Sequence, residues 1–81
     1  MDREQALTVV RESLAAAVPG ADSSGLASDA VLREELELDS LDFLSFVETL
    51  SGRTGVGIDE DDYARLDTLE ACAGFLVTRT G

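Results

Sequence analysis

Ser40 is the residue of this chain whose type and position best suit covalent chemistry. It stands between Asp39 and Leu41, at the point where a segment with helical periodicity begins. A serine at the start of a helix can be an ordinary capping residue, and its hydroxyl can also be a site of covalent attachment. The chain has no histidine, and Ser40 has no base of its own to activate the hydroxyl, which a serine nucleophile acting alone requires. The residues by themselves leave both interpretations open.

The rest of the sequence lacks the groups that most enzymes and metal sites use. There is no histidine, and Cys72 is the single cysteine, so the usual general base and a thiolate metal site are missing. The glycines within residues 52–57 lack the lysine and the spacing of a phosphate-binding loop. The acidic run at residues 59–62 lacks the glycine and glutamate of an EF-hand. We therefore expect no metal site and no enzymatic activity, and a small carboxylate enzyme is the weakest alternative.

The composition limits the partners and the compartment. The 81 residues give room for one small domain, residues 1–81. The net charge of −11 disfavours nucleic acid and anionic membrane surfaces as partners, because both attract cationic proteins. A single cysteine cannot form an intrachain disulfide, and the charged N-terminus does not resemble a signal peptide. We expect a cytoplasmic protein.

Three segments have apolar residues at helical spacing. They predict helices over residues 2–18, from residue 39 to the glycine-containing stretch 52–57 that ends the second helix, and from residue 67 onward. In each, the apolar residues recur every three or four positions and so share one face. The positions predicted to face the core are Leu7, Val10, Leu14 and Val18 in the first helix, Phe43, Phe46, Val47 and Leu50 in the second, and Leu69, Cys72 or Ala73, Leu76 and Val77 in the third.

Each of the three predicted helices has a candidate capping residue. Asp2 with Gln5 forms a capping pair for the first, and Asp39 caps the second. Asp67 with Glu70 has the spacing of a capping box for the third.

The segments between these helices are not featureless. Residues 19–39 form a long loop whose leucines indicate that it is pinned to the core, with one helical turn at residues 30–34 capped by Ser28 or Asp29. Residues 59–66 are predicted to form a short helix with an acidic first turn. The sequence thus predicts an all-α fold: a small antiparallel bundle of three main helices and one short helix, with a long loop between the first two main helices.

Leu41 and Leu44 do not belong to the predicted core face of their helix. At about 100° per residue they fall on the side that carries Ser40 and Glu48. Scattered surface leucines are common, so one interpretation is that these two have no role. The other is that they contact a partner protein.

The segment from Leu36 to Leu44 resembles the phosphopantetheine attachment motif of acyl carrier proteins, in which Asp-Ser-Leu opens the second helix. The serine stands at the middle of a chain of the family's length, after a long loop, and the resemblance covers residues 2–78. It implies that a separate phosphopantetheinyl transferase attaches 4′-phosphopantetheine from coenzyme A to Ser40, and that Asp39 and Leu41 complete the cofactor-binding site. The arm's thiol would then carry an acyl or aminoacyl group as a thioester and present it to loading and chain-modifying enzymes.

The resemblance also gives the acidic residues a role. The segment from Arg33 to Asp62 has ten acidic residues and two arginines, a net charge of −8. This charge is either a solvated face or a field that steers basic partner enzymes toward Ser40. Under the second interpretation Asp42, Leu44 and Glu48 are the expected partner-binding residues of a monomeric carrier. The acidic residues counted are Glu34, Glu35, Glu37, Asp39, Asp42, Glu48, Asp59, Glu60, Asp61 and Asp62.

Two features depart from the family's usual pattern. Glu37 occupies a position, two residues before the motif's aspartate, where glycine is common. Ser45, Ser51 and Arg53 replace acidic residues that carriers of fatty acid synthesis usually place along the second helix. A carrier of a polyketide, peptide or other specialised pathway is therefore as strong an expectation as one of fatty acid biosynthesis.

An unmodified protein-interaction module is the alternative from another functional class. In that interpretation Ser40 is only a helix cap, and Leu41, Phe43 and Leu44 form a docking patch on an acidic helical protein.

Overall fold

The structure is a computed structural model that describes residues 1–23 and 25–80. Within these residues the predicted all-α fold is confirmed, and no strand is present beyond an isolated bridge between Val31 and Thr68. The elements are helices α1 (Arg3–Ala17), α2 (Leu32–Glu35), α3 (Ser40–Thr54) and α4 (Leu69–Thr80), and the 3₁₀ helix η1 (Glu60–Arg65).

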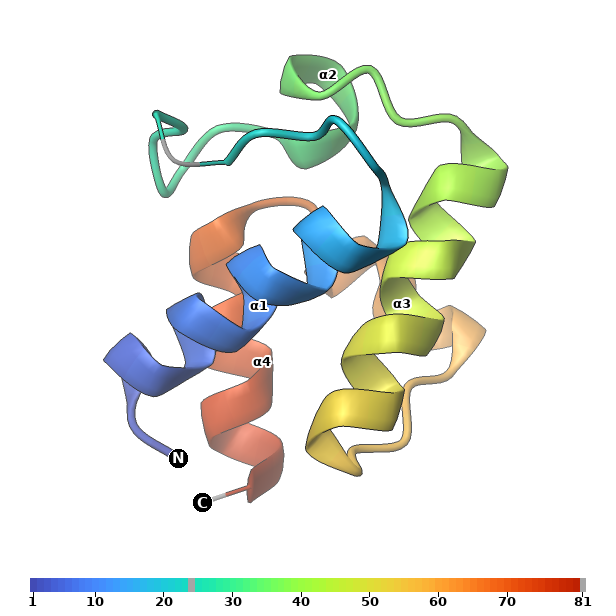
Figure 1. Cartoon of the computed structure of the whole chain (residues 1–81). Helices are drawn as coiled ribbons and strands as arrows, with labels where there is room; N and C mark the ends of the chain where they lie inside the picture. Colours follow the sequence, from blue (N-terminus) through green and yellow to red (C-terminus); the bar gives the residue numbers. More distant parts are fainter. Residues whose placement is uncertain (24, 81) are drawn as a thin grey trace.

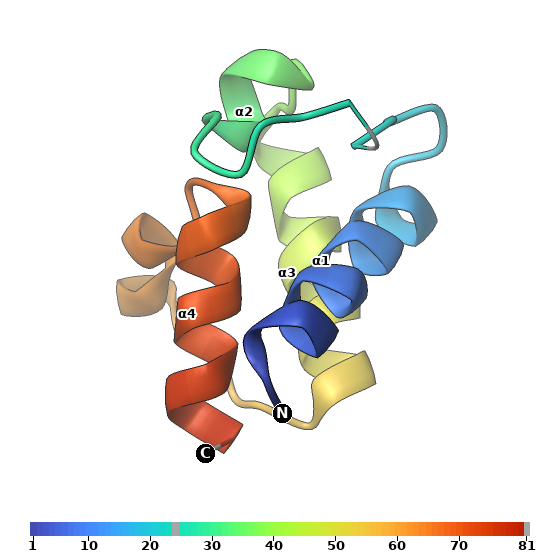
Figure 2. The same ribbon diagram turned by 90° about the vertical axis from the view of Figure 1, so that its left-hand side faces the viewer.

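Helix α1 packs against both α3 and α4 and crosses them obliquely, rising in the view in which they descend (Figure 1). The long connection between α1 and α3 crosses one end of the bundle and carries α2, while both termini lie at the other end (Figure 2). The first residues of α3 are therefore presented at the end of the molecule farthest from the termini.

The core forms where the apolar faces of the three long helices meet. All four core positions predicted for α3 are buried, as are Val10 and Leu14 of α1. Leu7, Val18 and Val77 are only partly buried and pack against this core, and Phe75, which was not predicted to face inward, is buried. Leucines of the long connection are buried as well, so the prediction that it is pinned to the core is confirmed. The buried leucines of this connection are Leu32 and Leu38.

The prediction that the glycine-containing stretch 52–57 ends helix α3 is confirmed. The helix continues past Gly52 to Thr54, and Gly55 is the residue that leaves it. Gly55 has a left-handed φ of 73°, and its N–H donates to the carbonyl of Ser51 at 2.8 Å. Glycine adopts this conformation without a side-chain clash, so a glycine at this position ends the helix.

The predicted cap of α4 is also wrong. Thr68 caps the helix, since its hydroxyl accepts a hydrogen bond from the N–H of Ala71 at 2.9 Å. Glu70 instead forms an ion pair with Arg3 at 3.4 Å. Aspartate and threonine are both good capping residues, so the sequence Asp67-Thr68 did not distinguish the two candidates.

The helical turn in the long connection is α2, and neither Ser28 nor Asp29 caps it. Its N-cap, Val31, makes no side-chain hydrogen bond. Backbone contacts replace the cap: the N–H of Leu32 donates to the carbonyl of Asp67 at 2.8 Å, and the N–H of Glu70 donates to the carbonyl of Ser28 at 2.9 Å. The starts of α2 and α4 thus satisfy some of each other's free backbone groups.

The predicted short helix at residues 59–66 is present as η1, in the tighter 3₁₀ form. Asp59 precedes it, and its backbone N–H donates to the Asp62 carboxylate at 3.1 Å. In the described part of the chain, no helix is long and apolar enough to cross a membrane.

Candidate functional site

Two aspartates hold the first turn of α3. The carboxylate of Asp39, the N-cap, accepts a hydrogen bond from the N–H of Asp42 at 2.8 Å. In return, the carboxylate of Asp42 accepts one from the N–H of Asp39 at 3.3 Å. The predicted cap is confirmed, and Asp42 adds the reciprocal bond of a capping box.

Ser40 is the first residue of α3 and is exposed. Asp39 supplies the side-chain cap, so the Ser40 hydroxyl is not needed for capping, and it makes no hydrogen bond with any described residue. The positive end of the helix dipole and the free N–H groups of the first turn favour a negative group at this position. The hydroxyl is therefore accessible, unpaired and placed where an anionic substituent is tolerated.

The loop before Ser40 is held in a specific conformation. Glu37 has a φ of 51°, in the left-handed region. The N–H of Leu38 donates to the carbonyl of Arg33 at 3.0 Å, which is the long hydrogen bond of a Schellman motif at the end of α2. Glycine is the usual residue at this position of the motif, so Glu37 adopts the conformation that a glycine would adopt with less strain.

The two leucines outside the core face are exposed, as predicted. Leu41 has 73% of its surface accessible and Leu44 has 38%. Leu44 also lines a cavity of about 220 Å³ together with Ser40. This cavity lies between α3 and residues of α2 and η1, and its other lining residues are Arg33, Phe43, Glu60 and Tyr63.

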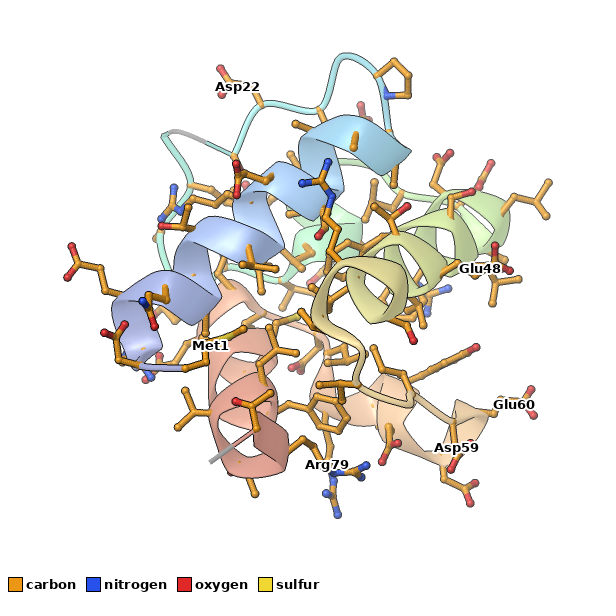
Figure 3. The ribbon with its side chains drawn as sticks, turned by 60° about the horizontal axis from the view of Figure 1, so that its bottom comes forward. Met1, Asp22, Glu48, Asp59, Glu60 and Arg79 are labelled. Atoms are coloured by element: carbon orange, nitrogen blue, oxygen red, sulfur yellow. The ribbon has the colours of Figure 1, made fainter. Side chains whose placement is uncertain are left out.

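Most of the acidic residues counted between residues 33 and 62 are exposed. Figure 3 shows Glu48, Asp59 and Glu60 projecting outward on one side of the molecule. Asp62 is an exception, and the expectation that it belongs to an exposed acidic face is wrong. It is buried, and its carboxylate pairs with the guanidinium of Arg79 at 3.1 Å. Asp62 therefore contributes little to an external field.

Comparison with known proteins agrees with this geometry. Residues 10–76 match the family model described as the phosphopantetheine attachment site. The match covers more than half of the chain and includes all of α3. The chain belongs to this phosphopantetheine-binding family. It is also 32% identical over 77 residues to an acyl carrier protein of Rubrobacter xylanophilus, which covers 95% of this chain and 94% of the relative.

The cofactor of the phosphopantetheine-binding family is the 4′-phosphopantetheine arm, as the sequence predicted. The residues at the start of α3 fit such a group, because the Ser40 hydroxyl is free and the helix end favours the negative charge of a phosphodiester. Among the described residues, no cluster of His, Cys, Asp or Glu side chains is arranged to hold a metal ion.

The protein's own thiol is unsuited to carry a thioester. Cys72 lies in the core, and burial, with a smaller contribution from the negative charge of Asp67, raises the pKa of its thiol from 9.0 to about 12. The thiolate is the nucleophilic form, so burial and the raised pKa make Cys72 a poor nucleophile in the folded protein. The prediction that it is a small core residue is confirmed.

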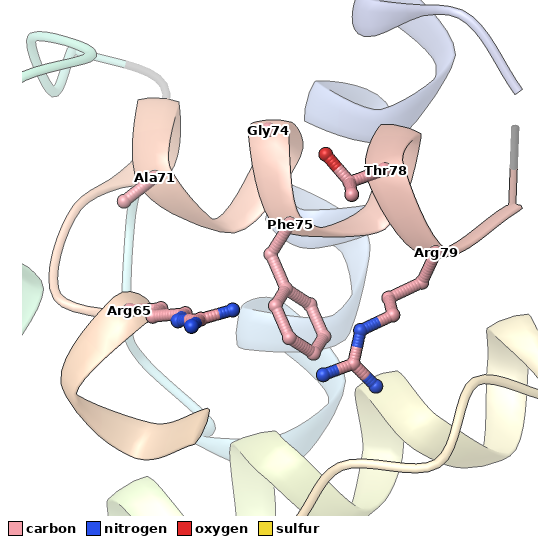
Figure 4. Close-up of a pocket in the computed structure, with 6 residues that line it drawn as sticks. All are labelled: Arg65, Ala71, Gly74, Phe75, Thr78 and Arg79. Atoms are coloured by element: carbon pink, nitrogen blue, oxygen red, sulfur yellow. The ribbon is translucent and has the colours of Figure 1, made fainter. Parts of the chain in front are cut away.

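A second cavity, of about 370 Å³, lies between η1 and α4 (Figure 4). The guanidinium of Arg79 lies over the ring of Phe75, 4.7 Å from its centroid, and Arg65 approaches the same ring from η1. No residue of α3 lines this cavity, so it is separate from the surroundings of Ser40.

Arg33 is a neighbour of Ser40 that the sequence did not indicate. Its guanidinium carbon lies 4.6 Å from the centroid of the Phe43 ring, and Arg33 and Ser40 line the same cavity. Because Arg33 belongs to the short helix α2, outside the periodic segments, no spacing rule connected it to the start of α3.

Proposed function

We propose that Ser40 carries the 4′-phosphopantetheine arm and that the protein acts as a carrier. A phosphopantetheinyl transferase would supply the base that the chain lacks. The Ser40 oxygen then forms a bond to the phosphorus next to the pantetheine unit of coenzyme A, the pyrophosphate bond breaks, adenosine 3′,5′-bisphosphate leaves, and the hydroxyl proton passes to the transferase.

The observation that carries this proposal is the state of the Ser40 side chain. Its hydroxyl is exposed and unpaired within the described residues, although it stands where serine often acts as a cap. The Asp39 carboxylate does the capping instead, with the N–H of Asp42 as donor at 2.8 Å. A rigid helix end holding a free hydroxyl suits attachment of a group by another enzyme.

The cargo in this proposal is an acyl or aminoacyl group, held as a thioester on the arm and presented to enzymes of fatty acid, polyketide or related biosynthesis. The protein itself catalyses no step. We further propose that residues 1–81 form one monomeric domain that works in the cytoplasm. Partner enzymes would dock at the exposed leucines and nearby acids, namely Leu41, Leu44, Asp42 and Glu48.

Mass analysis of the protein isolated from the cells that make it tests this function. The carrier predicts an intact mass larger than that of the chain by one phosphopantetheinyl group, with a further acyl mass that hydroxylamine removes. If the chain isolated from those cells is unmodified, the result would instead favour the interpretation as an unmodified protein-interaction module.

A further inference from the structure

Arg33 is held beside Ser40 without a carboxylate partner. Its guanidinium lies over Phe43 at 4.6 Å, an arrangement in which the ring face attracts the cation. Several acids are close in sequence, yet Arg33 forms no ion pair with any described residue. The Arg33 guanidinium is thus a cation within an acidic region that is available to bind an anionic group.

The backbone of Arg33 is fixed relative to the start of α3. Its carbonyl accepts the hydrogen bond from the N–H of Leu38 at 3.0 Å, and the preceding residue, Leu32, is tied to the Asp67 carbonyl. Phe43, which supports the guanidinium, is buried in α3 itself. The α2 backbone and the Phe43 ring therefore position the charge near Ser40 before any ligand is present.

We infer that Arg33 binds the phosphodiester formed on Ser40, an inference that rests on the proposed function. Modification adds a negative charge at a place where Asp39, Asp42 and Glu60 already repel it. An arginine fork matches the geometry of phosphate oxygens, and a guanidinium already supported by a ring loses less freedom when it binds.

The cavity that Arg33 and Ser40 share is of a size that suits the root of the arm. Its volume of about 220 Å³ is below the roughly 300–1,000 Å³ of sites that enclose a whole small molecule. Arg33 would therefore fix the direction in which the arm leaves Ser40, while the thiol end stays free to reach partner enzymes.

Phosphorus NMR of the modified protein tests this inference. The wild type, Arg33→Gln, Arg33→Lys and Arg53→Gln are each loaded from coenzyme A, and their ³¹P signals are compared with that of the same protein unfolded in urea. Arg53→Gln is the matched control, because it removes the same charge from the far end of α3, about 20 Å along the helix.

We expect the wild-type signal to differ from the unfolded reference in chemical shift and in line width. Arg33→Gln should move it toward that reference, Arg33→Lys should move it less, and Arg53→Gln should leave it unchanged. Modification should also lower the melting temperature of Arg33→Gln by about 2–5 °C more than that of Arg53→Gln. Comparing each variant before and after modification cancels the packing lost on Phe43.

Two failures are distinguishable. If no variant, the wild type included, gains the arm, the proposed function fails. If every variant is modified on Ser40 and Arg33→Gln behaves as Arg53→Gln does in both measurements, the arm is attached but Arg33 does not bind its phosphate, and the inference is overturned.

Discussion

Asp39 and Asp42 cap each other across the first turn of α3, and Ser40 lies between them. Each carboxylate accepts the other residue's backbone N–H, at 2.8 Å and 3.3 Å. Asp42 is half-buried and has a structural role here. A substitution at Asp42 would therefore remove the capping box and a surface charge together. Glu48 is exposed and forms no such hydrogen bond, so a substitution there changes the surface charge alone.

Replacing Asp39 with alanine should lower the free energy of unfolding by about 0.5–2 kcal/mol, the usual value of an N-cap. The same variant should be modified more slowly, because the turn that holds Ser40 frays. Urea unfolding and the rate of mass gain measure the two effects. Asp61→Ala, which removes an exposed acid of η1, is the control and should change stability by less than about 0.5 kcal/mol. Equal stability of the two variants would show that the cap is unimportant.

Replacing Glu37 with glycine should stabilise the protein by about 0.5–1 kcal/mol. A left-handed conformation costs a residue with a side chain roughly 1–2 kcal/mol, and part of this gain is offset because glycine is more flexible in the unfolded chain. Glu34→Gly, in the helical part of α2, should instead destabilise by about 1 kcal/mol. Urea unfolding of both variants checks the opposite signs, and a destabilised Glu37→Gly would contradict the left-handed turn.

Charge on α3 should govern how fast a transferase associates. Glu48→Lys should lower the apparent second-order rate of modification at low salt and matter little at high salt. The Debye length shrinks from about 10 Å at 0.1 M to about 3 Å at 1 M, which screens the steering field. Glu4→Lys makes the same charge change at the N-terminal end of α1, away from Ser40, and should have a smaller effect. If neither variant changes the rate of modification at low salt, the acidic face does not steer the transferase and serves only solubility.

The exposed leucine next to this charge should act on a different step. Leu44→Ala should weaken transferase binding at both low and high salt, chiefly through faster dissociation, because desolvated apolar contacts are insensitive to ionic strength. Dissociation rates at the two salt concentrations measure this, and an unchanged rate would place the docking surface elsewhere.

Cys72 should resist alkylation while the protein is folded. Iodoacetamide at pH 8 should label the modified protein once, on the arm, and twice only after unfolding. The pKa of this thiol is raised on folding from 9.0 to about 12, so its contribution to stability is complete below about pH 9 and is lost as pH rises toward 12. Stability of the wild type should thus fall more steeply above pH 9 than that of Cys72→Ala, by up to about 1.4 kcal/mol for each pH unit. Rapid labelling of Cys72 in the folded state would show that it is not buried.

Local rules were enough to predict the start of α3. Capping depends on residues three positions apart, and burial of Phe46 and Leu50 follows from helical spacing alone. The exposure of Leu41 and Leu44 follows from the same spacing, so the main features around Ser40 were predictable.

Several of the features that the sequence did not predict join segments that are distant along the chain. Asp62 pairs with Arg79 across 17 positions, and its burial could not be seen from a run of four acids. Arg33 lies ten positions before Phe43 and meets it only because the chain between α2 and α3 brings the guanidinium over the Phe43 ring. The backbone hydrogen bonds that take the place of the expected cap of α2 also join distant segments, because they form only where the start of α2 approaches the start of α4.

Loading of the purified protein from coenzyme A by a permissive phosphopantetheinyl transferase tests the central claim most directly. Wild type and Ser45→Ala, a control that removes another exposed serine of α3, should each gain the mass of one phosphopantetheinyl group, located by fragmentation on Ser40. Ser40→Ala should gain none while unfolding within about 0.5 kcal/mol of wild type, since its hydroxyl makes no hydrogen bond with the described residues. A mass gain that survives in Ser40→Ala, or none in the wild type, would contradict the assignment of Ser40 as the attachment site.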